Sequence, residues 1–346
     1  MTHFTNGIVG DRLLYSAVRT AITRAIKCGT KIESVAQRHS DGITMKGMAT
    51  RRPVCMVYPS LPGGPDFGIM RIAGAGIGNC LYAYFHAVVI AKEISGRVIA
   101  PTWSSVKVGP LLRRERSLRR YGTMFRAHPD EIHGVLKAIG LALLWPRHKS
   151  IEIRVGQEGG CAAVGGLIIV RVPGHEFTFV GLHQHRNMIR SRLLEILTTP
   201  PMETPKWGAG DYAAAHIRLG DFVSTPTSNL RQTFRDGERI PLTWYEHIIG
   251  RVRGTFPELP VYIFSDGREH ELAGVTKIEG VSLQREPNDV ADLLALAQAR
   301  LLIGSNSTFS RWAAFLGDMP SIWPNNKIRE KPTGEATPIL YVADDF

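Results

Sequence analysis

The order of apolar and polar segments along the chain predicts an α/β protein. A short apolar strand at Ile69 to Ala73 precedes a glycine turn, a long apolar helix at Asn79 to Ile94 and a second strand at Arg97 to Ala100. Strands in this order lie parallel, and the helix between them makes a right-handed crossover. The first half of the chain continues with β-like runs and one helix, at residues 151–155, 167–172, 177–180 and 187–197.

The same alternation restarts after a proline-containing linker at residues 198–205. Runs of strand length alternate there with runs of helical periodicity. The predicted strands are 212–217, 261–265, 281–283, 301–304 and 321–323, and the predicted helices are 242–252, 290–299 and 309–316. Two successive α/β units predict two Rossmann-like domains that face each other across a cleft, at residues 67–200 and 206–346.

Residues 1–66 are expected to form an N-terminal extension outside the main fold. Within it, Arg12 to Lys27 reads as an amphipathic helix with apolar residues on one face and basic residues on the other. Such a helix can lie on an anionic membrane surface. Packing on the protein body, with the basic face in water, is the alternative.

Composition and cysteine spacing limit the class of protein. The apolar fraction of 44% and the charged fraction of 21% are typical of a globular protein. Four cysteines stand far apart without a CxxC pair, which argues against a zinc site and a disulfide framework. No apolar run or signal pattern predicts export, so we expect a cytoplasmic protein, or one held peripherally on the inner face of the membrane.

The net charge of +11 indicates an anionic partner. Nucleic acid, an anionic membrane and a polyphosphate-bearing substrate would all attract such a chain. The sequence contains no zinc finger, RNA-recognition signature or basic-leucine pattern, so nucleic acid is not the expected partner.

Two segments of the sequence combine strand ends with groups suited to a phosphate ligand. Gly76, Gly78 and Asn79 lie between a strand and a helix, where backbone N–H groups can face an anion, although a plain tight turn explains them equally well. His216, Arg218 and Asp221 follow a predicted strand, and a guanidinium there can bind a diphosphate. A surface salt bridge between Arg218 and Asp221 is the alternative.

Two further segments complete the candidate site. Asp266 ends an apolar strand and can accept hydrogen bonds from a guanine base or cap the following turn. A cluster of hydroxyl groups precedes the last apolar helix, where it can bind phosphate or act as an ordinary N-cap. This cluster and the aromatic residue within it are Ser307, Thr308, Phe309 and Ser310.

Taken together, these segments resemble the bacterial α-1,2-fucosyltransferases, and more distantly the wider α-1,2/α-1,6/protein-O-fucosyltransferase group. The family pattern is a GGxGNQxFQYA-like opening, HIRRGDY, FSDD and NSTFSWWAAWL. This chain has AGAGIGNCLYAY at 73–84, HIRLGDF at 216–222, FSDG at 264–267 and NSTFSRWAAFL at 306–316. The resemblance implies a GT-B-like fold and an inverting, metal-independent transfer of L-fucose from GDP-fucose to a glycan or lipid-linked oligosaccharide, with α-1,2 linkage favoured and no cofactor.

The resemblance also implies roles for individual residues. Arg218 would neutralise the β-phosphate of the leaving group, and the 307–310 segment and Asp266 would contact the donor phosphates and nucleoside. Gly76, Gly78 and Asn79 would line the cleft near the transferred sugar. His216, or else Asp221, is the candidate base, although the reaction can also proceed with weak assistance from a base.

This chain departs from the family pattern at four positions: Cys80, Leu219, Gly267 and Arg311. These changes leave two alternatives open. One is a catalytically inert protein that binds a GDP-sugar, and the other is a related transferase with another linkage or another GDP-sugar.

Overall fold

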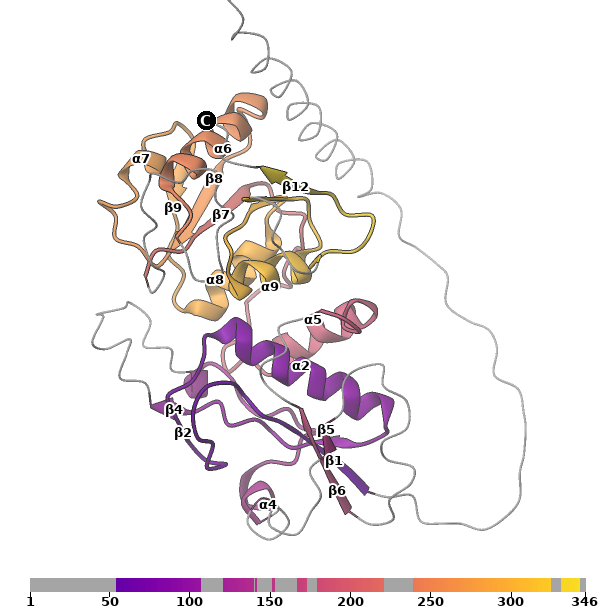
Figure 1. The fold of residues 1–346 in the computed structure, drawn as a ribbon. Coiled ribbons are helices and arrows are strands. Elements are labelled where there is room, and N and C mark those ends of the chain that lie inside the picture. The colour runs from indigo at the N-terminus through magenta and orange to yellow at the C-terminus, as the bar shows by residue number, and fades with distance from the viewer. Residues whose placement is uncertain are drawn as a thin grey trace, which may run out of the picture.

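The structure is a computed structural model of the chain, and it describes residues 54–106, 121–139, 141, 151–152, 167–172, 179–220, 239–324 and 331–342. The predicted helix at 12–27 lies outside these residues. The described chain forms two α/β domains, each built on a parallel sheet (Figure 1). None of the described helices is both long and apolar enough to cross a membrane.

The N-terminal domain is built on a four-stranded parallel sheet in the order β3-β1-β6-β5. Its strands are β1 (Val54–Pro59), β3 (Arg97–Val98), β5 (Ile151–Glu152) and β6 (Leu167–Val172). Helix α2 (Ile77–Glu93) joins β1 to β3 and packs against the sheet. Two short helices, α4 (Gly134–Ile139) and η1 (Tyr121–Thr123), follow β3, and η4 (His183–His185) and α5 (Arg186–Glu195) follow β6.

The boundary predicted at residue 67 is wrong, because β1 is a central strand of this sheet. It pairs with β6 along its whole length, and residues 55–58 are buried. A run that is buried on both faces is apolar throughout and shows no alternation, so the sequence did not mark it as a strand. The strand expected at 69–73 is instead β2 (Arg71–Ile72), which pairs with β4 (Ser105–Val106) in a separate two-stranded sheet.

The C-terminal domain confirms the predicted alternation of strands and helices. Its parallel sheet has the order β12-β11-β10-β7-β8-β9. The strands are β7 (Ala213–Ile217), β8 (Val261–Ser265), β9 (Val281–Leu283), β10 (Leu301–Ile303), β11 (Ser321–Pro324) and β12 (Ile339–Val342), and the helices are α6 (Leu242–Thr255), α7 (Ala273–Thr276), α8 (Asp289–Gln298) and α9 (Thr308–Gly317). The sequence predicted all of these strands except β12. Numbered within the domain, the order is 6-5-4-1-2-3, which is the doubly wound arrangement of Rossmann domains.

The two domains touch through α2 and α9 (Figure 1). Tyr82 and Phe85 of α2 lie 5.0 and 5.5 Å from the ring of Trp312 in α9. Phe179, which was predicted to lie in a strand, is outside any strand and stacks on Phe315 at 4.6 Å. Buried aromatic rings packed at such distances hold the starts of α2 and α9 in a fixed relation.

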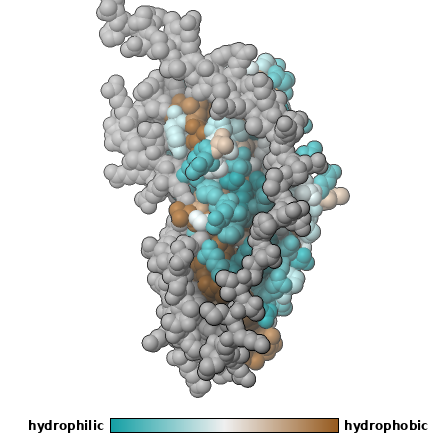
Figure 2. All heavy atoms as spheres, turned by 90° about the vertical axis from the view of Figure 1, so that its right-hand side faces the viewer, coloured by the Kyte–Doolittle hydropathy of each residue, from teal (hydrophilic) through white to brown (hydrophobic). Residues whose placement is uncertain are grey.

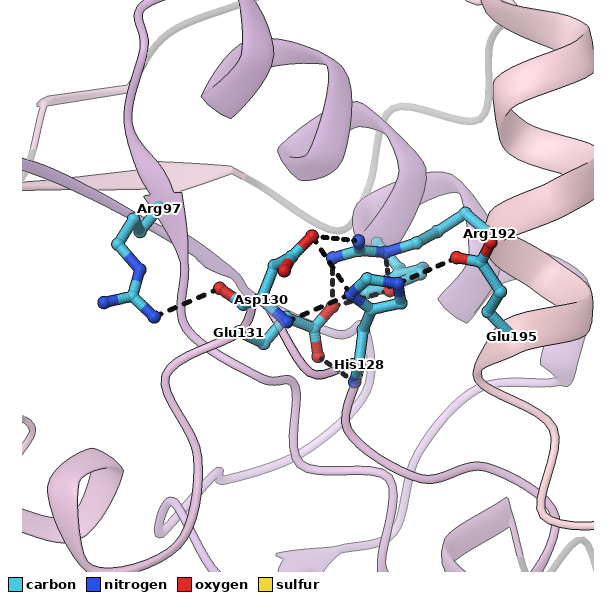
Figure 3. A network of polar contacts seen from close by, with 7 residues as sticks. Arg97, His128, Asp130, Glu131, Arg192 and Glu195 are labelled. Carbon is cyan, nitrogen blue, oxygen red and sulfur yellow. Dashed lines mark hydrogen bonds and ion pairs between the residues drawn. The ribbon is translucent and has the colours of Figure 1, made fainter.

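Helix α5 also connects the domains, through polar contacts on two sides. Toward the C-terminal domain, Arg186 forms an ion pair with Asp318, and Arg190 donates a hydrogen bond to the carbonyl oxygen of Leu316 at 2.6 Å. Toward the N-terminal domain, Arg192 and Glu195 enter the polar network drawn in Figure 3.

Glu131 is the centre of this network and is 3% exposed. Its carboxylate accepts hydrogen bonds from the hydroxyl of Tyr84 in α2 at 2.6 Å, from Arg192 in α5 at 3.1 Å and from the backbone N–H of His128 at 3.0 Å. His128 also lies 2.7 Å from Glu195 (Figure 3). A buried carboxylate with three donors thus joins α2, α5 and the loop before α4.

Candidate active site

The candidate site lies where the C-terminal sheet changes direction. The chain adds β8 and β9 on one side of β7, and β10, β11 and β12 on the other. Beyond the carboxyl ends of two adjacent strands that diverge in this way, connecting loops leave room for a ligand. The segments that follow β7 and β10 are the second and fourth motifs, so the fold brings these two motifs together.

His216, near the end of β7, is surrounded by hydroxyl groups from the segment after β10. Its Nδ1 lies 2.6 Å from Ser310 Oγ, 3.0 Å from Ser305 Oγ and 3.3 Å from Ser307 Oγ. The backbone N–H of Ser305 donates to Ser310 Oγ at 3.1 Å, and that of Ser310 donates to Ser307 Oγ at 3.2 Å. Ser307 is the N-cap of α9, which is one of the two roles that the sequence left open for this segment.

In this environment His216, the first candidate base, lies where it can position the serine hydroxyls at the start of α9. The side chain is buried, and burial together with the nearby positive charge of Arg218 lowers its pKa to about 3. A general base must reach the acceptor hydroxyl and have a pKa near the working pH. Neutral His216 instead fixes the serine hydroxyls at the start of α9.

The depressed pKa of His216 predicts a pH dependence of stability. Between the unfolded value near 6.5 and the folded value of about 3, only the unfolded chain binds the proton, so stability falls as the pH is lowered through this window. Unfolding by urea at pH values from 7 to 4 should therefore show a steeper loss for the wild type than for His216→Asn. The expected difference in slope is up to about 1.4 kcal/mol per pH unit. Parallel curves for the two proteins would show that His216 is not held neutral by the fold.

Arg218 and Asp266 form an ion pair beside this cluster. Strands β7 and β8 pair in a register that places Ile217 opposite Ser265, so the residues that follow them meet. Arg218 Nη1 lies 2.8 Å from Asp266 Oδ2, and the backbone N–H of Leu219 donates to Oδ1 at 2.8 Å. Both side chains are partly exposed, at 22% and 24%.

The pair adds a role for Asp266 to the one expected. Each of its oxygens contacts the segment after β7, so Asp266 holds Arg218 in place. Gly220 allows this approach, because a Cβ atom there would collide with the carboxylate. Asp221, expected to orient the guanidinium or act as a base, lies outside the described residues.

Two of the departures from the family pattern are in contact. A Cβ atom at Gly267 would meet the side chain of Leu219, which is buried. A buried apolar side chain packed on a glycine thus stands where the family pattern has an arginine and an acid. The other departures, Cys80 and Arg311, are also buried. All four changes therefore lie in packed positions, and Arg218 keeps its partner.

The first motif meets the fourth at the starts of α2 and α9. A Cβ atom at Gly78 would lie 2.7 Å from Thr308 Oγ1 and 2.9 Å from the Thr308 carbonyl carbon. The indole N–H of Trp312 donates to the carbonyl oxygen of Gly78 at 2.8 Å. No signal in the sequence predicted this bond between the domains.

Unpaired polar atoms lie next to this contact. The amide oxygens of Asn79 and Asn306 are buried and have no hydrogen-bond partner among the described residues. Unpaired buried acceptors are uncommon and often mark a place that a ligand completes. A Cβ atom at Gly76, by contrast, would meet nothing within 4 Å, so there is open space beside the first turn of α2.

The site thus combines one guanidinium, the starts of two helices and two unpaired amide oxygens. The first two can bind phosphate oxygens, and the amide oxygens can accept hydrogen bonds from hydroxyl or N–H groups. Phe309 lies beside His216, with 5.1 Å between the ring centroids, and is only partly buried. Within the described ranges, no three His, Cys, Asp or Glu side chains are grouped so as to hold a metal ion.

No protein-family model and no curated protein matches the chain. Among solved structures, POFUT1 in complex with GDP-fucose is 13% identical, with a TM-score of 0.43, over 85% of this chain and 98% of that one. The E. coli heptosyltransferase WaaC with ADP is 12% identical, with a TM-score of 0.38, over 84% and 93%. The fucosyltransferase NodZ from Bradyrhizobium is 11% identical, with a TM-score of 0.35, over 77% and 92%. Likeness at this level is too distant to assign a substrate.

Proposed function

We propose that this protein is an inverting, metal-independent glycosyltransferase that transfers L-fucose from GDP-fucose to a hydroxyl group of a glycan or lipid-linked oligosaccharide acceptor. An α-1,2 linkage is favoured by the motif resemblance. The observation that carries the proposal is the meeting of four sequence motifs at one place: Arg218 after β7, Asp266 after β8, and the starts of α2 and α9. Three of these motifs follow adjacent parallel strands of one sheet, and the fourth reaches the same place from the other domain.

In the proposed reaction, the acceptor oxygen attacks C1 of the donor sugar as the bond from C1 to the β-phosphate oxygen breaks. GDP leaves with the bonding electrons, and the acceptor loses its proton to a base or to water. Arg218, held by Asp266, neutralises the charge that develops on the β-phosphate. Such stabilisation is usually a large part of catalysis, and it supports a metal-independent mechanism.

The start of α9 contributes to the same charge stabilisation. Its N–H groups and those of the preceding turn face phosphate oxygens in the proposed complex, supported by the positive end of the helix dipole. The amide oxygens of Asn79 and Asn306 accept hydrogen bonds from sugar hydroxyls or from the base. His216 holds the serine hydroxyls and takes no proton.

The contact between Gly78 and Thr308 gives a direct test of the donor site. Gly78→Ala would place a methyl group against Thr308 and push the starts of α2 and α9 apart, so GDP-fucose should bind at least about tenfold more weakly, a loss of about 1.4 kcal/mol. Calorimetric titration with GDP-fucose, GDP-mannose, GDP, ADP and UDP, in EDTA and at two salt concentrations, measures affinity and selectivity. We expect guanine nucleotides to be preferred.

A matched control is available in the C-terminal domain. A Cβ atom at Gly250 in α6 meets nothing within 4 Å, so Gly250→Ala should leave nucleotide binding unchanged. Equal binding by both glycine variants, or no preference for guanine, would refute the site. Binding without release of GDP from GDP-fucose in the presence of glycan acceptors would favour the inert GDP-sugar-binding protein, and transfer from GDP-mannose would favour the related transferase.

A further inference from the structure

The small sheet of the N-terminal domain carries an exposed apolar hairpin. The backbone N–H of Phe67 donates to the Met70 carbonyl at 3.0 Å, which closes a tight turn, and Ile72 pairs with Val106 across β2 and β4. Ile69 at the tip is 78% exposed and Phe67 63%, and Met70, Ile72 and Val106 are also exposed.

The charged residues of this hairpin point inward. Asp66 accepts a hydrogen bond from the hydroxyl of Tyr58 at 2.6 Å, and Arg71 is 0% exposed and donates to the Thr102 carbonyl at 2.8 Å. The outer side of residues 67–70 therefore presents apolar groups alone.

Helix α4 shows the same arrangement, with apolar side chains exposed and a charged side chain buried. Val135 and Leu136 are 74% and 71% exposed and Ile139 is also exposed, whereas Lys137 is buried and donates to Thr102 Oγ1 at 3.0 Å. Burial lowers the pKa of Lys137 to about 8. Contiguous exposed apolar side chains of this kind mark interaction sites.

The hairpin and α4 belong to one surface. Thr102 Oγ1 accepts from Lys137 and donates to the Gly68 carbonyl at 3.0 Å, and a Cβ atom at Gly68 would meet Leu141 just beyond α4. We call this surface the apolar rim, and its members are Phe67, Ile69, Met70, Ile72, Val106, Val135, Leu136 and Ile139. In Figure 1, α4 lies at the end of the N-terminal domain that faces away from the C-terminal domain. Figure 2 views the molecule from the side opposite to β2 and β4; the described surface there is mostly hydrophilic, with smaller hydrophobic areas at several heights, one of them at the lower end.

We propose that the apolar rim inserts into the interface of an anionic lipid bilayer. Charge complementarity favours this occupant, because the chain carries a net charge of +11. In the sequence, β4 is followed at once by 107–120, with one lysine and five arginines against a single glutamate, and α4 is followed by Arg147, His148 and Lys149. Apolar groups enter the lipid interface, and a positive net charge attracts the chain to anionic headgroups. The contact leaves the switch point of the C-terminal sheet free and goes beyond the proposed function.

Vesicle flotation of the full chain tests the proposal. The probes are vesicles of phosphatidylcholine alone and of an equal mixture of phosphatidylcholine and phosphatidylglycerol. Wild type should bind the anionic vesicles, and Ile69→Asp and Leu136→Asp should each weaken binding at least about tenfold. Met202→Asp makes the same change of charge at a fully exposed apolar side chain outside the rim and should bind like the wild type.

Folding of each variant is checked by circular dichroism and by binding of GDP. Because GDP binding does not involve the rim, a failure of the proposed donor site would be distinguished from a failure of the membrane proposal. Ile69→Ser replaces the aspartate variant if that chain does not fold. Undiminished vesicle binding by both rim variants would overturn the proposal. Two other results would also overturn it. One is vesicle binding that is lost only in Leu14→Asp, within the predicted N-terminal helix. The other is a wild-type dimer that does not bind vesicles and that Ile69→Asp dissociates.

Discussion

Replacing Arg218 with alanine is expected to lower the rate of sugar transfer by about 10²–10³-fold, which corresponds to about 2.7–4 kcal/mol of lost transition-state stabilisation. The guanidinium lies at the carboxyl end of β7 and is fixed by Asp266 at 2.8 Å. Its charge matters most when the β-phosphate gains negative charge, so kcat should fall more than donor affinity. Steady-state kinetics with GDP-fucose and a responsive acceptor measure both quantities.

Three further variants make this result specific. Arg285→Ala removes an arginine whose ion pair with Glu269 is largely exposed, and it should leave kcat within about twofold. Asp266→Asn keeps the shape of the side chain but loses its charge, so kcat should fall by less than in Arg218→Ala. Arg218→Lys should restore only part of the rate, because an ammonium group cannot make the two-pronged contact of a guanidinium. Full activity in Arg218→Ala would remove Arg218 from the mechanism.

The second large effect concerns stability. Glu131→Ala is expected to lower the free energy of unfolding by about 3–5 kcal/mol, because it leaves the largely buried guanidinium of Arg192, whose side chain is 13% exposed, without its main partner. The carboxylate of Glu131 lies 3.1 Å from Arg192 and 2.6 Å from the hydroxyl of Tyr84, and its loss uncouples α5 from α2 (Figure 3). Urea unfolding followed by circular dichroism gives the change directly.

An exposed pair of the same kind provides the control. Glu269 pairs with Arg285 at 3.2 Å and is 78% exposed, so Glu269→Ala should change stability by less than about 1 kcal/mol. If Glu131→Ala were no more destabilising than Glu269→Ala, the network would not hold the two helices together. Replacing Glu131 and Arg192 together with residues of similar volume should recover part of the loss, because no charge is then left unpaired.

The sequence was sufficient for most of the architecture of the C-terminal domain. There the strands are short, a predicted helix follows three of the five predicted strands, and glycine, proline and polar residues mark the strand ends, so period and punctuation agree. Strands β8 and β9 have the predicted bounds, and Ser307 caps α9. The N-terminal sheet was harder to predict, because β1 is a continuous apolar run in a stretch that otherwise resembles a linker.

The sequence also named most residues of the site but could not assign their roles. Side-chain type and position at a strand end indicated His216, Arg218 and Asp266. Their roles depend on which groups lie beside them. The register of β7 and β8 and the crossover to β10 decide this, and both join segments that are far apart in the sequence. Burial keeps His216 neutral. The register of β7 and β8 pairs Arg218 with Asp266, and the packing of the two domains places Gly78 against Thr308. Local pattern thus determined the elements and the candidate groups, and only the tertiary structure decided which groups meet, because contact and burial depend on segments far apart in the chain.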